Sequence, residues 1–346
     1  MYDTYDEVAK LGIRDPEFTK YIKEHGYENM TSFTELPGLD ASSGAINSSA
    51  AQHGYIIDVP MRDGHLNPLR VHKPPASPAA NGQEKKSPLV VLIYGGGFQV
   101  GDNTQMSPFA RILNELHGAT VVNLSYRLVP SGHRWPTQPN DVWDNLQWLA
   151  ANAEAQLGAD PGAGFIVGGA SAGANLAAVA AQRWIGEKRE PALTGLHIAI
   201  PVLFVESNVP AAYRELWFSR EQNRDAFILN AAAVEALTDR YGPDTASPDW
   251  CPLNAENALV GYPRTYVSAC GEDPLRDDGL VYWRLLRDRG AETRIDVAPG
   301  VPHAHATFDG LVSGQKSNFA AVSGFGWLLR DEKTPEEIIK GMSVLA

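Results

Sequence analysis

The chain has 346 residues, of which 44% are hydrophobic and 20% charged, and this balance excludes a disordered chain and supports a large buried core. Lys and Arg total 29 against 41 Asp and Glu, a formal net charge of −12 that argues against nucleic acid or an anionic membrane as partner. No apolar run reaches the roughly 20 residues of a membrane span, and the acidic opening has no signal-peptide core. We therefore expect a cytoplasmic protein without stable membrane insertion.

The first part of the chain predicts short helices and then a hairpin. The expected elements are two helices and two paired strands: Asp6–Leu11, Asp15–His25, Tyr55–Val59 and Leu69–His72. A Ser- and Gly-rich stretch, Ala41–Ala51, separates the two pairs, and residues 62–64, Arg-Asp-Gly, form the expected turn of the hairpin. The Pro-rich segment 74–88 carries no core-forming residues, so it predicts a polar loop.

From residue 89 onward, apolar strands alternate with amphipathic helices. The expected strands are Leu89–Tyr94, Ala119–Leu124, Phe165–Val167, Leu196–Ile200, Arg264–Ser268 and Thr293–Val297. The expected helices between them are Ser107–His117, Pro139–Ala155, Ala172–Ile185 and Asp277–Arg289. This alternation predicts an α/β fold, with a mostly parallel sheet covered on both faces. Two last helices, Asn318–Arg330 and Pro335–Met342, could cover the sheet or serve a homodimer interface.

More than sixty residues between Ile200 and Arg264 contain no clear strand, which is too long for a simple crossover. Helices are expected there over Ala211–Arg220 and Asn230–Tyr241. We interpret this segment as an insertion that packs with the N-terminal helices as a lid. The expected division is an N-terminal part of the cap, a core, a cap insertion and the rest of the core: 1–50, 51–203, 204–250 and 251–346.

Residues 169–173 read Gly-Ala-Ser-Ala-Gly, a G-x-S-x-G motif. The motif follows the apolar strand Phe165–Val167 and opens an Ala-rich helix. A nucleophile elbow requires this context, because a tight strand-to-helix turn with small neighbours presents the Ser171 hydroxyl at a helix N-terminus. The simpler interpretation is a glycine-rich helix start chosen for close packing, and the strand-turn-helix context favours the nucleophile.

A second glycine motif, Tyr94-Gly95-Gly96-Gly97-Phe98, ends the first apolar strand of the alternation. Its glycines expose backbone N–H groups, of which two can bind one developing oxyanion while the N–H of Ala172 supplies a third. The alternative is a phosphate-binding loop or a flexible turn. The Gly-Lys-Ser/Thr of a Walker loop and the G-x-G-x-x-G pattern are both absent here.

Candidate acids and a candidate base follow the last two strands. Residues 271–277, Gly-Glu-Asp-Pro-Leu-Arg-Asp, come after the strand that ends at Ser268, and Pro299–His303 come after the strand that ends at Val297. Carboxyl ends of parallel strands meet at one edge of the sheet, where ligands bind. An acid, a His and Ser171 can therefore converge there, in the chain order that a hydrolase triad needs.

Together these motifs resemble the hormone-sensitive-lipase branch of the α/β-hydrolases, a family of many microbial and fungal carboxylesterases. The resemblance runs from Leu89 to Trp327. Besides the motifs above, it includes the block Tyr126-Arg127-Leu128-Val129-Pro130, with Pro136, Asp141 and Trp148 beyond. It implies an α/β-hydrolase fold with a sheet of about eight strands under a helical cap.

The resemblance also implies roles. Ser171 would be the nucleophile, Asp273 the orienting acid and His303 the base. His305 is the rival base, and the family pattern Pro-Gly-x-Pro-His favours His303. Asp277 is the rival acid, and we expect it instead to cap the helix that follows.

The oxyanion-hole donors implied by the family are the N–H groups of Gly96, Gly97 and Ala172. Departures from the family pattern are Tyr94 where His is usual, Ala170 and Ala174 around the elbow, and Ala304-His305 after the base. They leave the triad positions occupied and suggest an unusual pocket. Tyr94 is expected either to change the position of the glycine loop or to line the site.

The expected function is a serine carboxylesterase for short- to medium-chain or aromatic esters, with no metal or cofactor and with Cys251 and Cys270 in the core. The candidate pocket residues are Tyr94, Phe98, Tyr213, Trp217, Phe218 and His305. Further aromatic candidates are Phe227 of the insertion and Phe18, Tyr21 and Phe33 of the N-terminal segment, all of which could instead pack the cap on the core. Two alternatives stay open: a non-hydrolytic reaction by the same triad, and a binding module like the gibberellin-receptor relatives that lack triad members.

Overall fold

The computed structural model describes residues 2–30, 54–75 and 86–345. The Ser- and Gly-rich stretch Ala41–Ala51, Phe33 and most of the polar loop 74–88 lie outside the described residues. Every helix within these ranges is too short or too polar to cross a membrane.

Within the described ranges, eight strands form one sheet in the order β1-β2-β4-β3-β5-β6-β7-β8. The strands are β1 Tyr55–Pro60, β2 Leu66–His72, β3 Leu89–Ile93, β4 Thr120–Leu124, β5 Phe165–Ala170, β6 Gly195–Ala199, β7 Arg264–Cys270 and β8 Thr293–Ala298. Strand β2 runs antiparallel to both of its neighbours, and all other pairs are parallel. This topology confirms the predicted hairpin and the mostly parallel α/β sheet.

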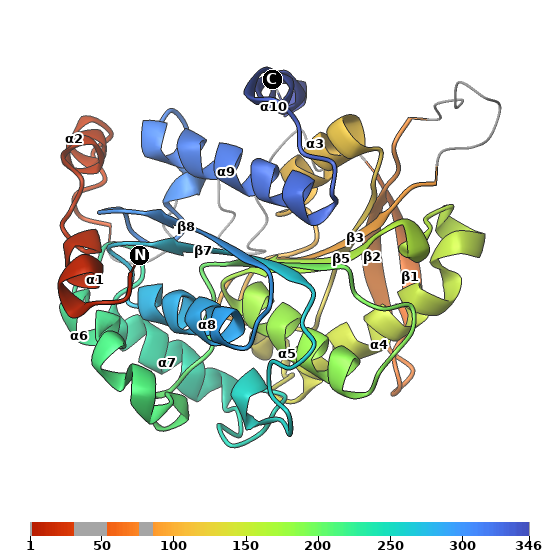
Figure 1. Ribbon diagram of the computed structural model, residues 1–346, viewed down its shortest axis with the longest axis horizontal. Helices are drawn as coiled ribbons and strands as arrows, with labels where there is room; N and C mark the ends of the chain where they lie inside the picture. The colour runs from red at the N-terminus through yellow and green to blue at the C-terminus, as the bar shows by residue number, and fades with distance from the viewer. Residues whose placement is uncertain (1, 31–53, 76–85, 346) are drawn as a thin grey trace.

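Helices cover both faces of the sheet. They are α1 Tyr5–Leu11, α2 Pro16–Glu24, α3 Ser107–His117, α4 Thr137–Asn152, α5 Ala172–Gly186, α6 Ser219–Gln222, α7 Ala231–Tyr241, α8 Arg276–Asp288, α9 Val312–Leu328 and α10 Pro335–Met342. On one face lie α3 and α9, with α10 outside them, and on the other lie α4, α5 and α8 (Figure 1). Helices α1 and α2 lie at the β8 edge of the sheet, near α6 (Figure 1).

Strand β3 shows why the central strands are apolar throughout. Leu89, Val91 and Ile93 pack in the core under α4 and α5, whereas Val90 and Leu92 pack in the core under α3 and α9. Successive side chains of a strand point to opposite faces, so a strand covered on both faces needs an apolar residue at every position. All five side chains are fully buried.

The segment between β6 and β7 departs from the prediction at its first helix. Instead of one helix over Ala211–Arg220, the chain forms a 3-10 segment, Ala211–Leu216, and then α6. The break falls at Trp217 and Phe218, where the carboxylate of Asp277 in α8 accepts the main-chain N–H groups of Phe218 and Ser219 that a continuous helix would use internally. The indole N–H of Trp217 donates to the Asp278 carboxylate at 2.8 Å.

The N-terminal helices pack against this same segment. Gln222, at the end of α6, donates to the carbonyl of Ala9 in α1 at 2.7 Å. The rings of Phe18 in α2 and Phe227 lie 5.7 Å apart. These contacts bring together the two segments that were expected to form a cap, and the division of the chain into cap and core stays a prediction.

Candidate active site

Ser171 occupies a strained turn between β5 and α5. Its φ of 55° and ψ of −117° are values that side-chain-bearing residues rarely adopt. The turn is tight because the chain passes close to the end of β3: a Cβ on Gly173 would lie 2.2 Å from the carbonyl oxygen of Ile93. A Cβ on Gly169 would lie 2.3 Å from the carbonyl oxygen of Gly173. Both glycines of the motif are therefore required by the geometry that presents the serine.

Replacing Gly173 by alanine is expected to lower the free energy of unfolding by about 3 kcal/mol or more, because main-chain oxygens cannot move away from the added methyl group. Gly186→Ala at the other end of α5 is the matched control, since a Cβ there would meet its nearest atom only at 4.0 Å. Urea denaturation measures both. Similar midpoints for the two variants would contradict this account of the elbow.

The three predicted triad residues form one hydrogen-bonded chain. His303 Nε2 lies 3.0 Å from Ser171 Oγ, and His303 Nδ1 lies 2.7 Å from Asp273 Oδ2. Asp273 is fully buried, and its other oxygen accepts the N–H of Leu275 at 2.8 Å. The residues follow the carboxyl ends of β5, β7 and β8, as their positions along the chain predicted.

Polar contacts between distant segments hold the acid and base loops in place. The N–H of Glu272 donates to the carbonyl of Val301 at 3.0 Å, which joins the two loops directly. Arg14, between α1 and α2, pairs with the Glu272 carboxylate, with 2.8 Å between Nε and Oε1. Asn223, after α6, donates to the carbonyl of Asp273 at 2.9 Å. Sequence analysis missed Arg14 and Asn223, because their partners are remote in the chain.

The glycine loop follows β3 and lies beside the elbow. Gly96 has a φ of 124°, and a Cβ there would lie 2.1 Å from the carbonyl oxygen of Val100. Within the part of the chain that the structure describes, the N–H groups of Gly96 and Gly97 donate no hydrogen bond. Ala172 is the first residue of α5, so its N–H has no acceptor within the helix. A Cβ on Gly97 would lie 3.0 Å from Leu237 of α7, a neighbour that the sequence did not reveal.

His305 does not lie where a second base was predicted. Its Nδ1 lies 3.3 Å from Cys270 Sγ, and its Nε2 lies 2.9 Å from Ser317 Oγ. Burial lowers the pKa of His305 to about 4. The side chain is thus buried in a neutral form with both ring nitrogens bonded to groups other than Ser171, and its place in the pocket stays a prediction.

The depressed pKa of His305 predicts a stability that depends on pH. The unfolded chain binds the proton near pH 6.5, so the unfolded state is favoured as pH falls from about 6.5 to about 4. Stability is fully present above pH 6.5, and about 2 kcal/mol of it is lost at pH 5 through this group.

His305→Phe is expected to remove this part of the acid sensitivity. Urea denaturation of both proteins at pH 7.5 and pH 5.0 measures it as a smaller drop in the variant. His197, whose pKa burial lowers to about 3, is present in both proteins and cancels in the comparison. An identical drop in both proteins would contradict the assignment to His305.

Asp277 was expected to cap the helix that follows it, and this expectation is wrong. Asp277 lies inside α8, and its Oδ2 accepts the N–H groups of Phe218 and Ser219 at 2.7 and 2.6 Å. It therefore caps the start of α6. The neighbouring Asp278 Oδ2 accepts the N–H groups that begin the segment after β6, Leu203 at 2.8 Å and Phe204 at 3.1 Å.

Each of the five aromatic residues predicted to line the pocket has a packing or hydrogen-bonding partner within the protein, and their place in the pocket stays a prediction. Tyr94 is buried against Tyr126, and Phe98 is stacked on Tyr241 with 3.8 Å between ring centroids. The remaining three bond or pack against helices: Tyr213 to Asp288, Trp217 to Asp278 and Phe218 against Tyr5.

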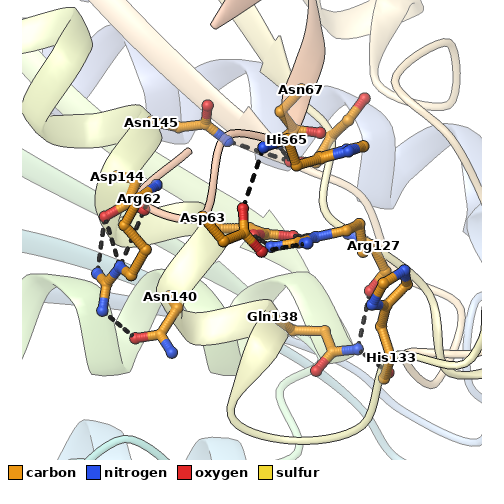
Figure 2. A network of polar contacts seen from close by, with 12 residues as sticks. Arg62, Asp63, His65, Asn67, Arg127, His133, Gln138, Asn140, Asp144 and Asn145 are labelled. Atoms are coloured by element: carbon orange, nitrogen blue, oxygen red, sulfur yellow. Dashed lines mark hydrogen bonds and ion pairs between the residues drawn. The ribbon is translucent and has the colours of Figure 1, made fainter. Parts of the chain in front are cut away.

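The block after β4 has a structural role that its motif did not specify. The Arg127 guanidinium donates to Asp141 of α4 at 2.7 Å and to Asp63 in the β1–β2 turn at 2.6 Å. Figure 2 shows Arg127 and Asp63 facing each other in this network. Two residues further on, the N–H of Val129 donates to the carbonyl of Phe98 at 3.0 Å. The network thereby connects the edge hairpin and α4 to the end of the glycine loop.

Both cysteines are buried free thiols, as predicted. Burial raises the pKa of Cys251 to about 12, so its thiol stays protonated. In residues 2–30, 54–75 and 86–345, no group of three or more His, Cys, Asp or Glu side chains is arranged to hold a metal ion.

Comparison with known proteins agrees with this fold. The sequence profile of the family described as the alpha/beta hydrolase fold (Abhydrolase_3) matches residues 90–307. An AB hydrolase superfamily protein of Schizosaccharomyces pombe is 30% identical over 332 residues, which cover 93% of this chain and 96% of the relative. The chain belongs to the α/β-hydrolase fold family, in its hormone-sensitive-lipase-like branch.

Two further similarities bear on chemistry. Versiconal hemiacetal acetate esterase of Dothistroma septosporum is 28% identical over 292 residues, or 84% of this chain and 87% of the relative. The crystal structure of vibralactone cyclase is similar with a TM-score of 0.79 and 27% identity, covering 93% of this chain and 96% of that one. These similarities support an esterase-type α/β-hydrolase, on a fold that also carries a cyclase.

Proposed function

We propose that the protein is a serine carboxylesterase that hydrolyses short- to medium-chain or aromatic esters through an acyl-enzyme. The observation that carries this proposal is the hydrogen-bonded chain from Ser171 through His303 to the buried Asp273, with distances of 3.0 and 2.7 Å. The similarity to an acetate esterase supports the same chemistry.

Acylation begins when Ser171 Oγ attacks the ester carbonyl carbon and His303 Nε2 takes the hydroxyl proton. The bond to the alcohol then breaks, and His303 gives its proton to the leaving oxygen. Water next attacks the acyl-enzyme while giving a proton to His303. Ser171 recovers that proton when the carboxylic acid leaves, so the enzyme returns to its starting state.

Asp273 and the glycine loop stabilise the charges that form during each step. Asp273 accepts the Nδ1–H of His303, which fixes the imidazole tautomer and stabilises the imidazolium. The negative charge on the substrate oxygen is bound by the N–H groups of Gly96, Gly97 and Ala172. A donor of this kind is typically worth about 3 kcal/mol in the transition state.

The preference for shorter or flat acyl groups is supported by an apolar side chain beside the glycine loop. A Cβ on Gly97 would lie 3.0 Å from Leu237 of α7. Rates for p-nitrophenyl esters of increasing acyl length are expected to peak at short or medium chains. A steady rise beyond about twelve carbons would contradict the proposed substrate class.

The reaction itself is tested by turnover of p-nitrophenyl acetate and butyrate, together with labelling by a fluorophosphonate. We expect one equivalent of probe on Ser171, located by mass spectrometry of the digested protein, and loss of turnover in proportion to labelling. Turnover that persists in the fully labelled protein would overturn the proposal.

The similarity to vibralactone cyclase favours a second candidate, in which the acyl group passes to a hydroxyl of the same substrate instead of water. The product would then be a lactone, and Ser171 and His303 would keep the same roles. Product analysis with a hydroxy ester separates the two: free acid supports the esterase, and lactone supports the cyclase. A labelled protein that is silent toward p-nitrophenyl esters would shift the proposal to this candidate.

A further inference from the structure

Two tyrosines next to the glycine loop bond each other's main chain. Tyr94 follows β3 and Tyr126 follows β4, and their rings stack with 4.4 Å between centroids and 12° between planes. The Tyr94 hydroxyl donates to the carbonyl of Tyr126, and the Tyr126 hydroxyl donates to the carbonyl of Tyr94, each at 3.1 Å. Both residues are at least 97% buried, so these two bonds are shielded from water.

One of the two bonds holds a peptide unit that leads into the glycine loop. The carbonyl of Tyr94 and the N–H of Gly95 belong to the same planar unit. The carbonyl accepts the Tyr126 hydroxyl, and the N–H donates to Gln105 Oε1 at 2.8 Å. Side-chain bonds at opposite edges of a rigid plane fix its rotation. The next N–H groups along the chain are those of Gly96 and Gly97.

This peptide unit also lies against the nucleophile's own turn. A Cβ on Gly95 would lie 2.8 Å from the carbonyl oxygen of Ala170 and 3.2 Å from Ser171 Cβ. A Cβ on Gly173 would lie 2.4 Å from the carbonyl oxygen of Tyr94. A rotation of the unit would therefore change the position of the glycine-loop donors relative to the serine oxygen.

We propose that Tyr126 and Gln105 are positioning residues, which clamp the Tyr94–Gly95 peptide unit and thereby aim the N–H groups of Gly96 and Gly97 at the oxyanion. The inference rests on the proposed function, since it needs an oxyanion to form at the nucleophile. In this proposal Tyr94, which stands where His is usual, serves through a main-chain contact and not as a pocket residue.

The two hydroxyl groups of the pair have different consequences for the site. The Tyr94 hydroxyl bonds the carbonyl of Tyr126, which leads into the chain after β4 and reaches the glycine loop only at its far end, where the N–H of Val129 donates to the carbonyl of Phe98. The Tyr126 hydroxyl bonds the carbonyl that leads into the loop. The bonds are equal in length and similarly buried, so the pair supplies its own matched control.

Tyr126→Phe and Tyr94→Phe each remove one of these bonds and keep the stacked rings. The measurements are the rate constant for fluorophosphonate labelling of Ser171, and kcat and KM for p-nitrophenyl butyrate. Tyr126→Phe is expected to slow labelling and kcat about tenfold with KM within about twofold, because misplaced donors weaken only the transition state. Tyr94→Phe is expected to slow them less than about threefold, while urea midpoints shift alike in both.

Gln105→Met, which removes the acceptor at the other edge of the peptide unit, is expected to match Tyr126→Phe. Equal slowing by the two tyrosine variants would show that the pair only packs, and it would overturn the clamp. A wild-type protein that the probe does not label would overturn the proposed function itself. If the wild-type protein is labelled but does not hydrolyse esters, the labelling rate constants of the variants still test the clamp, because labelling needs no water.

Discussion

Replacing either Ser171 or His303 by alanine is expected to lower kcat for p-nitrophenyl butyrate by about 10⁴-fold or more. Without the hydroxyl no acyl-enzyme forms, and without the imidazole nothing takes the proton from Ser171 Oγ. The two groups act as one unit across a 3.0 Å hydrogen bond, so the double variant is expected to be no slower than the slower single variant. Steady-state kinetics on the four proteins measure this non-additivity.

His305→Phe is the control for the choice of base. His305 bonds Cys270 and Ser317 and makes no hydrogen bond to the nucleophile, so its replacement is expected to leave kcat within about tenfold. If this variant lost as much activity as His303→Ala, the assignment of the base would be wrong. If the fold-losses in kcat of the two single variants multiplied in the double variant, Ser171 and His303 would act independently.

Asp273→Asn is expected to lower kcat by about 10⁴-fold with a much smaller change in KM. The amide can present an N–H to Nδ1 of His303, which would hold the imidazole in the tautomer whose proton faces Ser171. The substitution keeps the size of a fully buried side chain, so the fold is expected to persist. Kinetics together with circular dichroism separate the lost activity from unfolding.

Asp277→Asn is the matched control, because it changes the other buried aspartate of the same motif in the same way. Asp277 bonds the main chain at the start of α6 and not the base. We expect it to reduce the free energy of unfolding by about 1–3 kcal/mol while kcat stays within about tenfold. Equal losses of activity in the two variants would contradict the assignment of Asp273 as the orienting acid.

The parallel strands and the triad could be predicted because both leave a recognisable pattern in the local sequence. Strand β3 is apolar at every position since both of its faces are covered, and this pattern is visible without any knowledge of the neighbours. Ser171, Asp273 and His303 each follow a strand of one parallel sheet, so their convergence required only the strand ends to be located.

The rest of the site depends on contacts that leave no local pattern. Arg14 and Glu272 are 258 positions apart, and the Gln105 side chain reaches the glycine loop through an ordinary hydrogen bond from the N–H of Gly95 to its amide oxygen. The partners of the aromatic candidates could not be predicted, because composition gives the number of rings and not their direction. Tyr213 and Phe218 lie in the segment over the core, yet their side chains contact Asp288 and Tyr5.

Two carboxylates in the first turn of α8 bind the segment after β6 at four points, and at each of them the donor is a main-chain N–H group of that segment. Asp278 accepts the N–H groups of Leu203 and Phe204, and Asp277 accepts those of Phe218 and Ser219. Every residue type except proline offers such an N–H group. These four bonds therefore set no requirement on the side chains that carry them, and the side chains are constrained instead by packing, since Leu203, Phe204 and Ser219 are buried. The sequence between Phe204 and Phe218 can then be exchanged to explore new substrates, while the attachment points and the triad stay unchanged.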